Sequence, residues 1–254
     1  SKNTLKGVGF FMGAVLLSVL GFMGAVWFMV IMLLLVAVAS LFLLKEDMGK
    51  ASQKPKFREI LSKDERVNRL SAARVFLFGA RDVWFVVALP VFMSTQLGWD
   101  HWQVGGFMAA WVTGYGVVQG FGPRLTGAAS GRVQDGKVAA AWAMALAASP
   151  LLIALGLYAN VPVGPLLVFG LAVFGLLFAV NSTLHSYLIV AYAKADGVSM
   201  DVGFYYMANA MGRLTGTVLS GWVYQMWGLQ ACLVVSGLFI LTAAVIARPL
   251  PQPR

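Results

Sequence analysis

The sequence predicts an all-α polytopic membrane protein, because its composition, the length of its apolar runs and the placement of its cations agree. Of the 254 residues, 59% are hydrophobic and 11% are charged, whereas a soluble domain carries about 25% charged residues. The mean hydropathy is +0.79. Several apolar runs reach the roughly 20 residues that a helix needs to cross a bilayer. We therefore expect the chain to be embedded in a lipid bilayer.

About eight membrane-spanning helices fit the sequence, at lengths close to the roughly 20 residues required. They cover residues 7–21, 25–44, 71–95, 102–121, 137–158, 164–192, 201–224 and 229–247. The first two are joined by a tight turn at residues 21–24. A single buried helix hairpin is the alternative at this point, but the 38 uncharged residues of 7–44 fit two spans better.

The lysine and arginine residues predict the orientation. If the N-terminus is cytoplasmic, every Lys and Arg outside the spans falls in a cytoplasmic segment, including those at the C-terminus. This is the positive-inside rule, and it supports the helix count as well. Three cations remain inside spans: Arg74, Arg81 and Arg213. The net charge of +9 is thus explained by topology. No nucleic-acid partner is expected, since the cations are spread over several loops and form no known nucleic-acid-binding motif.

A basic linker divides the helices into a block of two and a block of six. We predict the last two helices of an N-terminal bundle in 1–44, a cytoplasmic linker in 45–70 and a six-helix bundle in 71–254. This arrangement is typical of a twelve-helix transporter of the major facilitator superfamily. The chain would then contain the fifth to the twelfth helix of such a transporter. The sequence opens without an initiator Met, a few residues before a span, so a fragment of a longer transporter is expected.

No constellation for catalysis or metal binding stands out in the sequence. The single cysteine, Cys232, lies in an apolar run and has no partner for a disulfide or a metal site. Nucleophile, zinc-protease and phosphate-loop motifs are absent from the sequence. We expect neither an enzyme nor a bound cofactor.

Charged residues at bilayer depth are costly and usually face a polar interior, so Arg81 and Asp82 indicate a functional site. Arginine suits bidentate recognition of phosphate or carboxylate, and Arg81, Arg213 and the shallower Arg74 predict an anionic substrate. Arg74 can alternatively reach the cytoplasmic interface. A purely structural clamp of Asp82 with Arg81 or Arg213 also agrees with the sequence. Asp82 and His185 are the candidates for proton coupling.

Six further polar residues are candidates for lining the substrate path: Tyr115, Gln119, Asn181, His185, Tyr205 and Asn209. His185 belongs to a polar island late in an apolar helix. It can donate a hydrogen bond or a charge to an anion, or it can form a hydrogen bond with a backbone or hydroxyl group. Tyr115 and Gln119 share a helix face with Trp111, which agrees equally with simple packing. Three pairs of glycines four residues apart favour close helix packing: Gly9 and Gly13, Gly116 and Gly120, and Gly212 and Gly216.

Three stretches carry a family resemblance: RVFLFGARDVWFVV from Arg74, LHSYLIVAY from Leu184, and GFYYMANAMGRL from Gly203. They resemble the ArsJ group of organoarsenical exporters within the major facilitator superfamily. The resemblance covers the six-helix part and extends to the first two helices.

The resemblance implies a bacterial inner-membrane exporter of 1-arseno-3-phosphoglycerate, which confers arsenate resistance. A glyceraldehyde-3-phosphate dehydrogenase, which makes this adduct from arsenate, is then a functional partner. Within transport, the alternative is an exporter or exchanger of another organic anion or a drug. From other classes, a membrane scaffold or receptor remains open, and an intramembrane enzyme is disfavoured because no nucleophile–base pair can be identified.

Overall fold

The computed structural model of the chain describes residues 2–43, 62, 64–131, 134–193 and 198–253, and every regular element in them is a helix. The helices are α1 (Lys2–Leu43), α2 (Glu65–Phe85), α3 (Ala88–Gln96), α4 (His101–Gly120), α5 (Gly122–Leu125), the 3₁₀ turn η2 (Ala128–Ser130), α6 (Gly136–Tyr158), α7 (Val163–Tyr192) and α8 (Val198–Ala247). The predicted all-α class is confirmed for these residues.

Within the described residues, five helices are long and apolar enough to cross a membrane. They are Gly7–Leu43, Glu65–Gln96, Gly136–Tyr158, Val163–Tyr192 and Met200–Ala247. Glycine breaks divide the first and the last of them. The predicted count of about eight spans, and the assignment to helices five to twelve, stay predictions.

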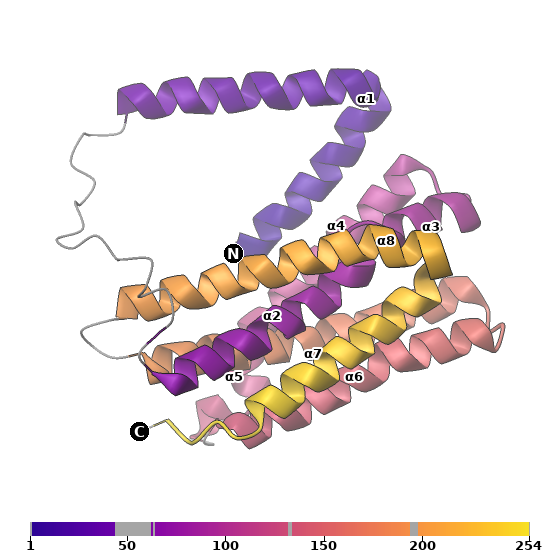
Figure 1. Cartoon of the computed structure of the whole chain (residues 1–254). Coiled ribbons are helices and arrows are strands. Elements are labelled where there is room, and N and C mark those ends of the chain that lie inside the picture. Colours follow the sequence, from indigo (N-terminus) through magenta and orange to yellow (C-terminus); the bar gives the residue numbers. More distant parts are fainter. Residues whose placement is uncertain (1, 44–61, 63, 132–133, 194–197, 254) are drawn as a thin grey trace.

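Two glycines with positive φ divide the longest helices. Gly21 in α1 has a φ of 66° and Gly228 in α8 a φ of 76°, a region that glycine adopts readily. The breaks fall where the sequence predicts the ends of helices. The part of α1 before Gly21 packs on α4. The part after it lies apart from the other helices, and its large apolar side chains are exposed (Figure 1).

The helix predicted over residues 71–95 forms as two helices, α2 and α3. Pro90 explains the break, since proline lacks an N–H and clashes with the carbonyl four residues earlier. The N–H groups of Val87 and Ala88 instead donate to the hydroxyl of Ser220, at 3.3 and 3.0 Å. Helix α8 thus holds α2 and α3 at their junction.

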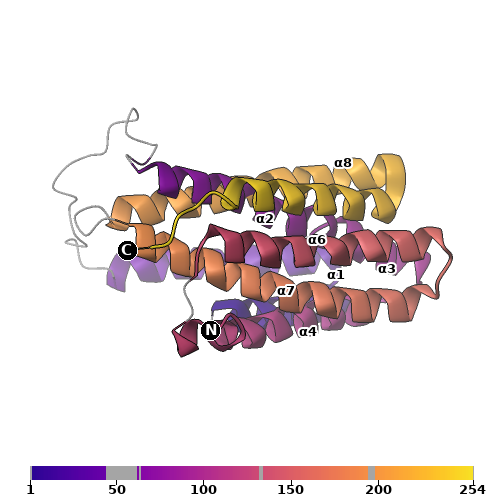
Figure 2. The ribbon, with the colours of Figure 1, turned by 90° about the horizontal axis from the view of Figure 1, so that it is seen from below.

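Basic residues gather at one end of the helix bundle. Arg66 and Arg69 begin α2, Arg124 lies in α5, Lys137 begins α6, and Arg248 follows α8. Figures 1 and 2 show these helix ends on the same side as both chain termini, opposite the bends at Gly21 and Gly228. We call this the basic end. Its clustering is what the positive-inside prediction requires.

Candidate functional site

Asp82 lies at the centre of a bridge between two arginines. Its side chain is fully buried, and Arg81 Nε donates to Oδ1 at 2.6 Å while Arg213 Nε donates to Oδ2 at 3.0 Å. Arg81 is 13% exposed and Arg213 46%. The sequence left either arginine open as the partner of Asp82, and the structure pairs it with both. One carboxylate therefore balances two guanidinium groups.

Close packing of α8 against α2 brings Arg213 to Asp82. A Cβ on Gly212 would lie 2.2 Å from the carbonyl oxygen of Val75, and one on Gly216 would lie 2.5 Å from that of Gly79. Only glycine allows the two backbones to approach this closely. The packing role predicted for the Gly212 and Gly216 spacing is confirmed by these distances.

The other glycine pairs of the same spacing behave differently. A Cβ on Gly9, Gly13 or Gly120 would meet nothing within 4 Å. Gly9 and Gly13 instead line a cavity of about 740 Å³ between α1, α3 and α4, whose wall also includes Arg213. Expected helix packing is therefore wrong at these three glycines among the described residues.

A smaller cavity lies directly at the bridge. Its volume is about 130 Å³, and Arg81, Asp82 and Arg213 line it together with Tyr115 and Trp111. Arg213 and Phe10 border both cavities. The ion bridge thus faces a small cavity that aromatic and aliphatic side chains also line, next to a larger apolar one.

Arg74 has a different environment, although it lies on the same helix. It is 4% exposed, and Nη1 donates to the carbonyl oxygen of Ser182 at 3.3 Å. Its Nε has no hydrogen-bond partner among the described residues, and no described carboxylate forms an ion pair with it. Its guanidinium lies over the rings of Phe78, at 3.9 Å, and Tyr205, at 4.8 Å. The side chain is buried, so Arg74 does not take the alternative position at the cytoplasmic interface.

Phe78 lies between the two cationic positions. The guanidinium carbons of Arg74 and Arg81 lie 3.9 and 5.3 Å from its ring centroid. The two arginines are seven residues apart, which places them about 10 Å apart along the helix axis. Cation–π contact stabilises a guanidinium without neutralising it, so this ring leaves both positive charges in place.

The residues from 74 to 254 match the model of the Major Facilitator Superfamily. The chain belongs to this superfamily. A comparison with curated proteins found no match. The protein is therefore an integral membrane protein and a secondary transporter of a small molecule, of a class that is generally not enzymatic. No group of three or more His, Cys, Asp or Glu side chains in the described residues is placed to hold a metal ion.

In this major facilitator protein, the polar island of α7 faces the surroundings of Arg74. Gln119 Nε2 donates to Ser182 Oγ at 3.2 Å, and the carbonyl of the same serine accepts from Arg74. Asn181 Nδ2 donates to the carbonyls of Trp142 and Leu177, at 3.0 and 2.9 Å. Gln119 and Ser182 thus form part of the same polar group as Arg74.

Several buried polar atoms of this part of the transporter lack a partner among the described residues. They include Asn181 Oδ1, His185 Nδ1 and Asn209 Oδ1. His185 is only 1% exposed. Its Nδ1 does not make the hydrogen bond to a backbone or hydroxyl group that the sequence allows, as far as the described residues show. A buried polar atom without a partner costs free energy, and such atoms are the ones that a polar ligand can satisfy.

The aromatic candidates divide between packing and the site. Tyr115 stacks on Trp111, with ring centroids 6.0 Å apart, and Trp111 Nε1 donates to the carbonyl of Leu171 at 2.7 Å. This is core packing, although both rings also border the small cavity. Tyr205 is buried beside Arg74, while Tyr206 is exposed.

Sequence reasoning missed two contributors to the site. Phe78 separates the two cationic positions, and Ser182 joins Gln119 to Arg74. Phe78 lies one turn after Arg74 on α2, and this i, i+4 spacing was the available signal. Nothing local in the sequence connects Ser182 to α2, 108 residues away.

Proposed function

We propose that this major facilitator protein exports an organic anion with two oxyanionic ends, and specifically 1-arseno-3-phosphoglycerate, by alternating access. The observation that carries the proposal is the pair of cationic positions on α2, Arg74 and the Arg81–Asp82–Arg213 bridge, separated by Phe78. Two separated positive charges match a solute with a phosphate at one end and an acyl arsenate at the other.

The two positions would hold an oxyanion in different ways. Among the described residues, Arg74 Nε has no hydrogen-bond partner and its guanidinium has no carboxylate partner, so Arg74 offers donors without displacing anything. At the bridge, an oxyanion replaces Asp82 on one arginine. Arg213 is the one to release, because it is more exposed and lies between the two cavities. Charge-assisted bonds of this kind are roughly twice as strong as neutral ones.

The remaining candidates surround these positions in the proposal. His185, Asn181, Tyr205 and Asn209 complete the Arg74 position, Gln119 orients Ser182 beside it, and Tyr115 closes the small cavity at the bridge. Asp82 competes with the substrate for the arginines. Protonation of Asp82 would release both of them, which makes it the first candidate for coupling export to protons, with His185 as the second.

The identity of the substrate rests on the resemblance to the ArsJ group. It brings with it a location in the bacterial inner membrane with the C-terminus in the cytoplasm. It also brings a functional partnership with a glyceraldehyde-3-phosphate dehydrogenase that makes the adduct.

Everted membrane vesicles test this proposal. Glyceraldehyde-3-phosphate dehydrogenase, NAD, glyceraldehyde 3-phosphate and arsenate are supplied outside, so that the adduct forms at the cytoplasmic face. We expect arsenic to accumulate inside the vesicles only when the dehydrogenase is present. Arg74→Ala and Arg213→Ala should abolish the uptake, while Arg69→Ala, an exposed surface residue, should not. Equal uptake without the dehydrogenase, or full uptake in both site variants, would contradict the proposal.

A second candidate is export of an amphipathic organic anion or drug. The apolar cavity of about 740 Å³, bordered by Arg213, favours it. Uptake of a fluorescent lipophilic anion in the same vesicles, unaffected by the dehydrogenase and lost in Arg213→Ala, would select this candidate instead.

A further inference from the structure

Asn209 lies between the two cationic positions of the site. On α8, Tyr205, Asn209 and Arg213 follow one another at intervals of four residues, so each is the neighbour of the next on the helix surface. The Tyr205 ring lies 4.8 Å from the Arg74 guanidinium, and Arg213 donates to Asp82 at 3.0 Å. At 1.5 Å per residue, Asn209 is about 6 Å along the helix axis from each of its two neighbours in this row.

The amide oxygen of Asn209 is a buried acceptor. Among the described residues, Asn209 Oδ1 has no hydrogen-bond partner. An amide oxygen can only accept, so a donor is the one group that can satisfy it. Leaving such an atom buried and unpaired costs free energy. The site therefore lacks a hydrogen-bond donor at a point midway between its two positive charges.

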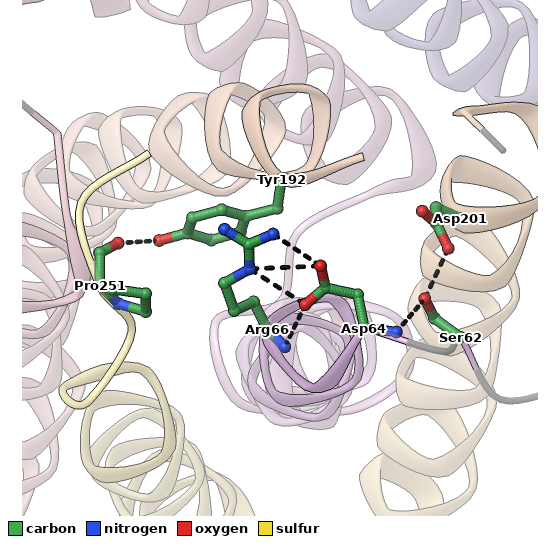
Figure 3. Close-up of polar contacts among 6 residues, drawn as sticks. All are labelled: Ser62, Asp64, Arg66, Tyr192, Asp201 and Pro251. Carbon is green, nitrogen blue, oxygen red and sulfur yellow. Dashed lines mark hydrogen bonds and ion pairs between the residues drawn. The ribbon is translucent and has the colours of Figure 1, made fainter. Parts of the chain in front are cut away.

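Polar side chains nearer the basic end are satisfied within the chain. Ser62 Oγ donates to Asp201 Oδ1 at 2.6 Å, and the Tyr192 hydroxyl donates to the carbonyl of Pro251 at 2.5 Å (Figure 3). Asp201 lies on α8 eight residues before Asn209, about two turns away. The same helix thus has one acceptor that the chain supplies with a donor, and a deeper one that it does not, as far as the described residues show.

The chemistry of the site restricts the kind of donor that can reach Asn209. The oxygens of an ionised phosphate or arsenate accept hydrogen bonds and donate none, so neither charged end of a substrate can satisfy the amide oxygen. An ammonium group is disfavoured there, because Arg74 and Arg213 are positive and like charges repel. A hydroxyl is the smallest neutral group that donates. The middle of the solute is where such a group would meet Asn209.

We propose that Asn209 is a specificity residue, which selects anions that carry a hydroxyl group on the carbon between their two charged ends. The inference rests on the proposed function for the two ends of the solute. It adds a requirement that the arginines do not impose, since a guanidinium only donates and binds an oxyanion whether or not a hydroxyl lies beside it. A site built to bond a substrate hydroxyl discriminates strongly against the analogue that lacks it, because a buried polar group is then left unpaired.

Two stable compounds that differ in one hydroxyl group test the proposal. Glycerol 1,3-bisphosphate and propane-1,3-diol bisphosphate both carry a phosphate at each end, and only the first has a hydroxyl on the carbon between them. Their affinities are measured by calorimetry on the full chain in lipid nanodiscs, at one pH and one salt concentration. We expect the hydroxylated compound to bind roughly tenfold more tightly, as one hydrogen bond made or lost at a buried acceptor implies.

Asn209→Leu and a matched control assign the preference to one side chain. Asn209→Leu removes the amide and keeps a side chain of similar size, so the two compounds should then bind with affinities within about twofold of each other. The affinity for the compound without the hydroxyl should stay as it is in the unmodified chain. Thr215→Val is the control, because Thr215 is an exposed polar residue of the same helix that lies outside the row. It should retain the full preference.

Three results would overturn the role of Asn209. They are equal affinity of the unmodified chain for the two compounds, an undiminished preference in Asn209→Leu, and loss of both compounds in Asn209→Leu, which would mean a general role in the site. Equal binding of both compounds leaves the proposed export of two-ended anions standing. Binding of neither compound to the unmodified chain contradicts the proposed function itself, so the two failures are distinguishable.

Discussion

Arg74 and Arg81 are the same residue type, seven positions apart on one helix, yet their charges are balanced in opposite ways. Arg81 shares the buried carboxylate of Asp82 with Arg213, whereas Arg74, in the part of the chain that the structure describes, contacts one carbonyl and two aromatic rings. Burying a charge is costly unless it is paired. The bridge therefore has a structural role even without substrate. Burial of the Arg74 charge without a described counter-ion does not stabilise the fold, and it is better explained by the binding of a ligand.

The largest effect is expected at Asp82. Asp82→Ala leaves two guanidinium groups facing each other without a counter-ion, and breaking a buried pair by removing one partner costs about 3–5 kcal/mol. We expect a severe loss of folded protein, measured by thermal unfolding of the purified transporter in detergent. Asp82→Ala combined with Arg213→Ala should recover part of the lost stability. A melting temperature unchanged by Asp82→Ala would mean that the bridge does not stabilise the fold.

Arg74 should show the reverse pattern. Arg74→Met removes a buried charge that has no described carboxylate partner and keeps an apolar side chain for Phe78 and Tyr205 to contact. We expect unchanged or higher thermal stability with transport lowered about 10- to 100-fold, since hydrogen bonds to charged groups contribute about 1.5–3 kcal/mol. Melting and vesicle uptake are measured on the same preparation. A strongly destabilised Arg74→Met with normal residual uptake would reverse our assignment of the two arginines.

A substitution at Gly216 tests the close packing of α8 on α2 that brings Arg213 to Asp82. Gly216→Ala places a Cβ 2.5 Å from the carbonyl of Gly79 and 3.0 Å from the Asp82 Cβ, and overpacking of this kind typically costs about 1–3 kcal/mol. The matched control is Gly221→Ala on the same helix, where a Cβ meets nothing within 4 Å; it should change stability by less than about 0.5 kcal/mol. Equal melting temperatures for the two variants would show that α2 and α8 have more room than the structure describes.

The sequence predicts the cationic residues better than their partners. Arg74, Arg81, Asp82 and Arg213 were identified because charges in an apolar run are rare and costly, and the packing role of Gly212 and Gly216 followed from their spacing. Each of these signals is local, because it can be recognised within one short stretch of the sequence.

The partners depend on contacts that no local pattern encodes. Asp82 bonds both its chain neighbour and a residue 131 positions away, and Ser220 caps the break before Pro90 from another helix. Ser62 donates to Asp201 across 139 positions. Such pairings follow from how the helices pack, and a single sequence carries no record of them.

The smallest effect on stability distinguishes the two arginines within the bridge. Arg213→Gln removes the more exposed partner and leaves Asp82 paired with Arg81. Partly exposed ion pairs contribute about 0–1 kcal/mol, so we expect a stability loss of this size, whereas Arg81→Gln should cost more because Arg81 is better buried. If Arg213 is the arginine that leaves Asp82 to receive the anion, transport must fall in Arg213→Gln far more than stability does. Proportional losses of melting temperature and vesicle uptake in Arg213→Gln would instead make Arg213 a second structural anchor, and the whole bridge would then be architecture, with Arg74 as the remaining position for the anion.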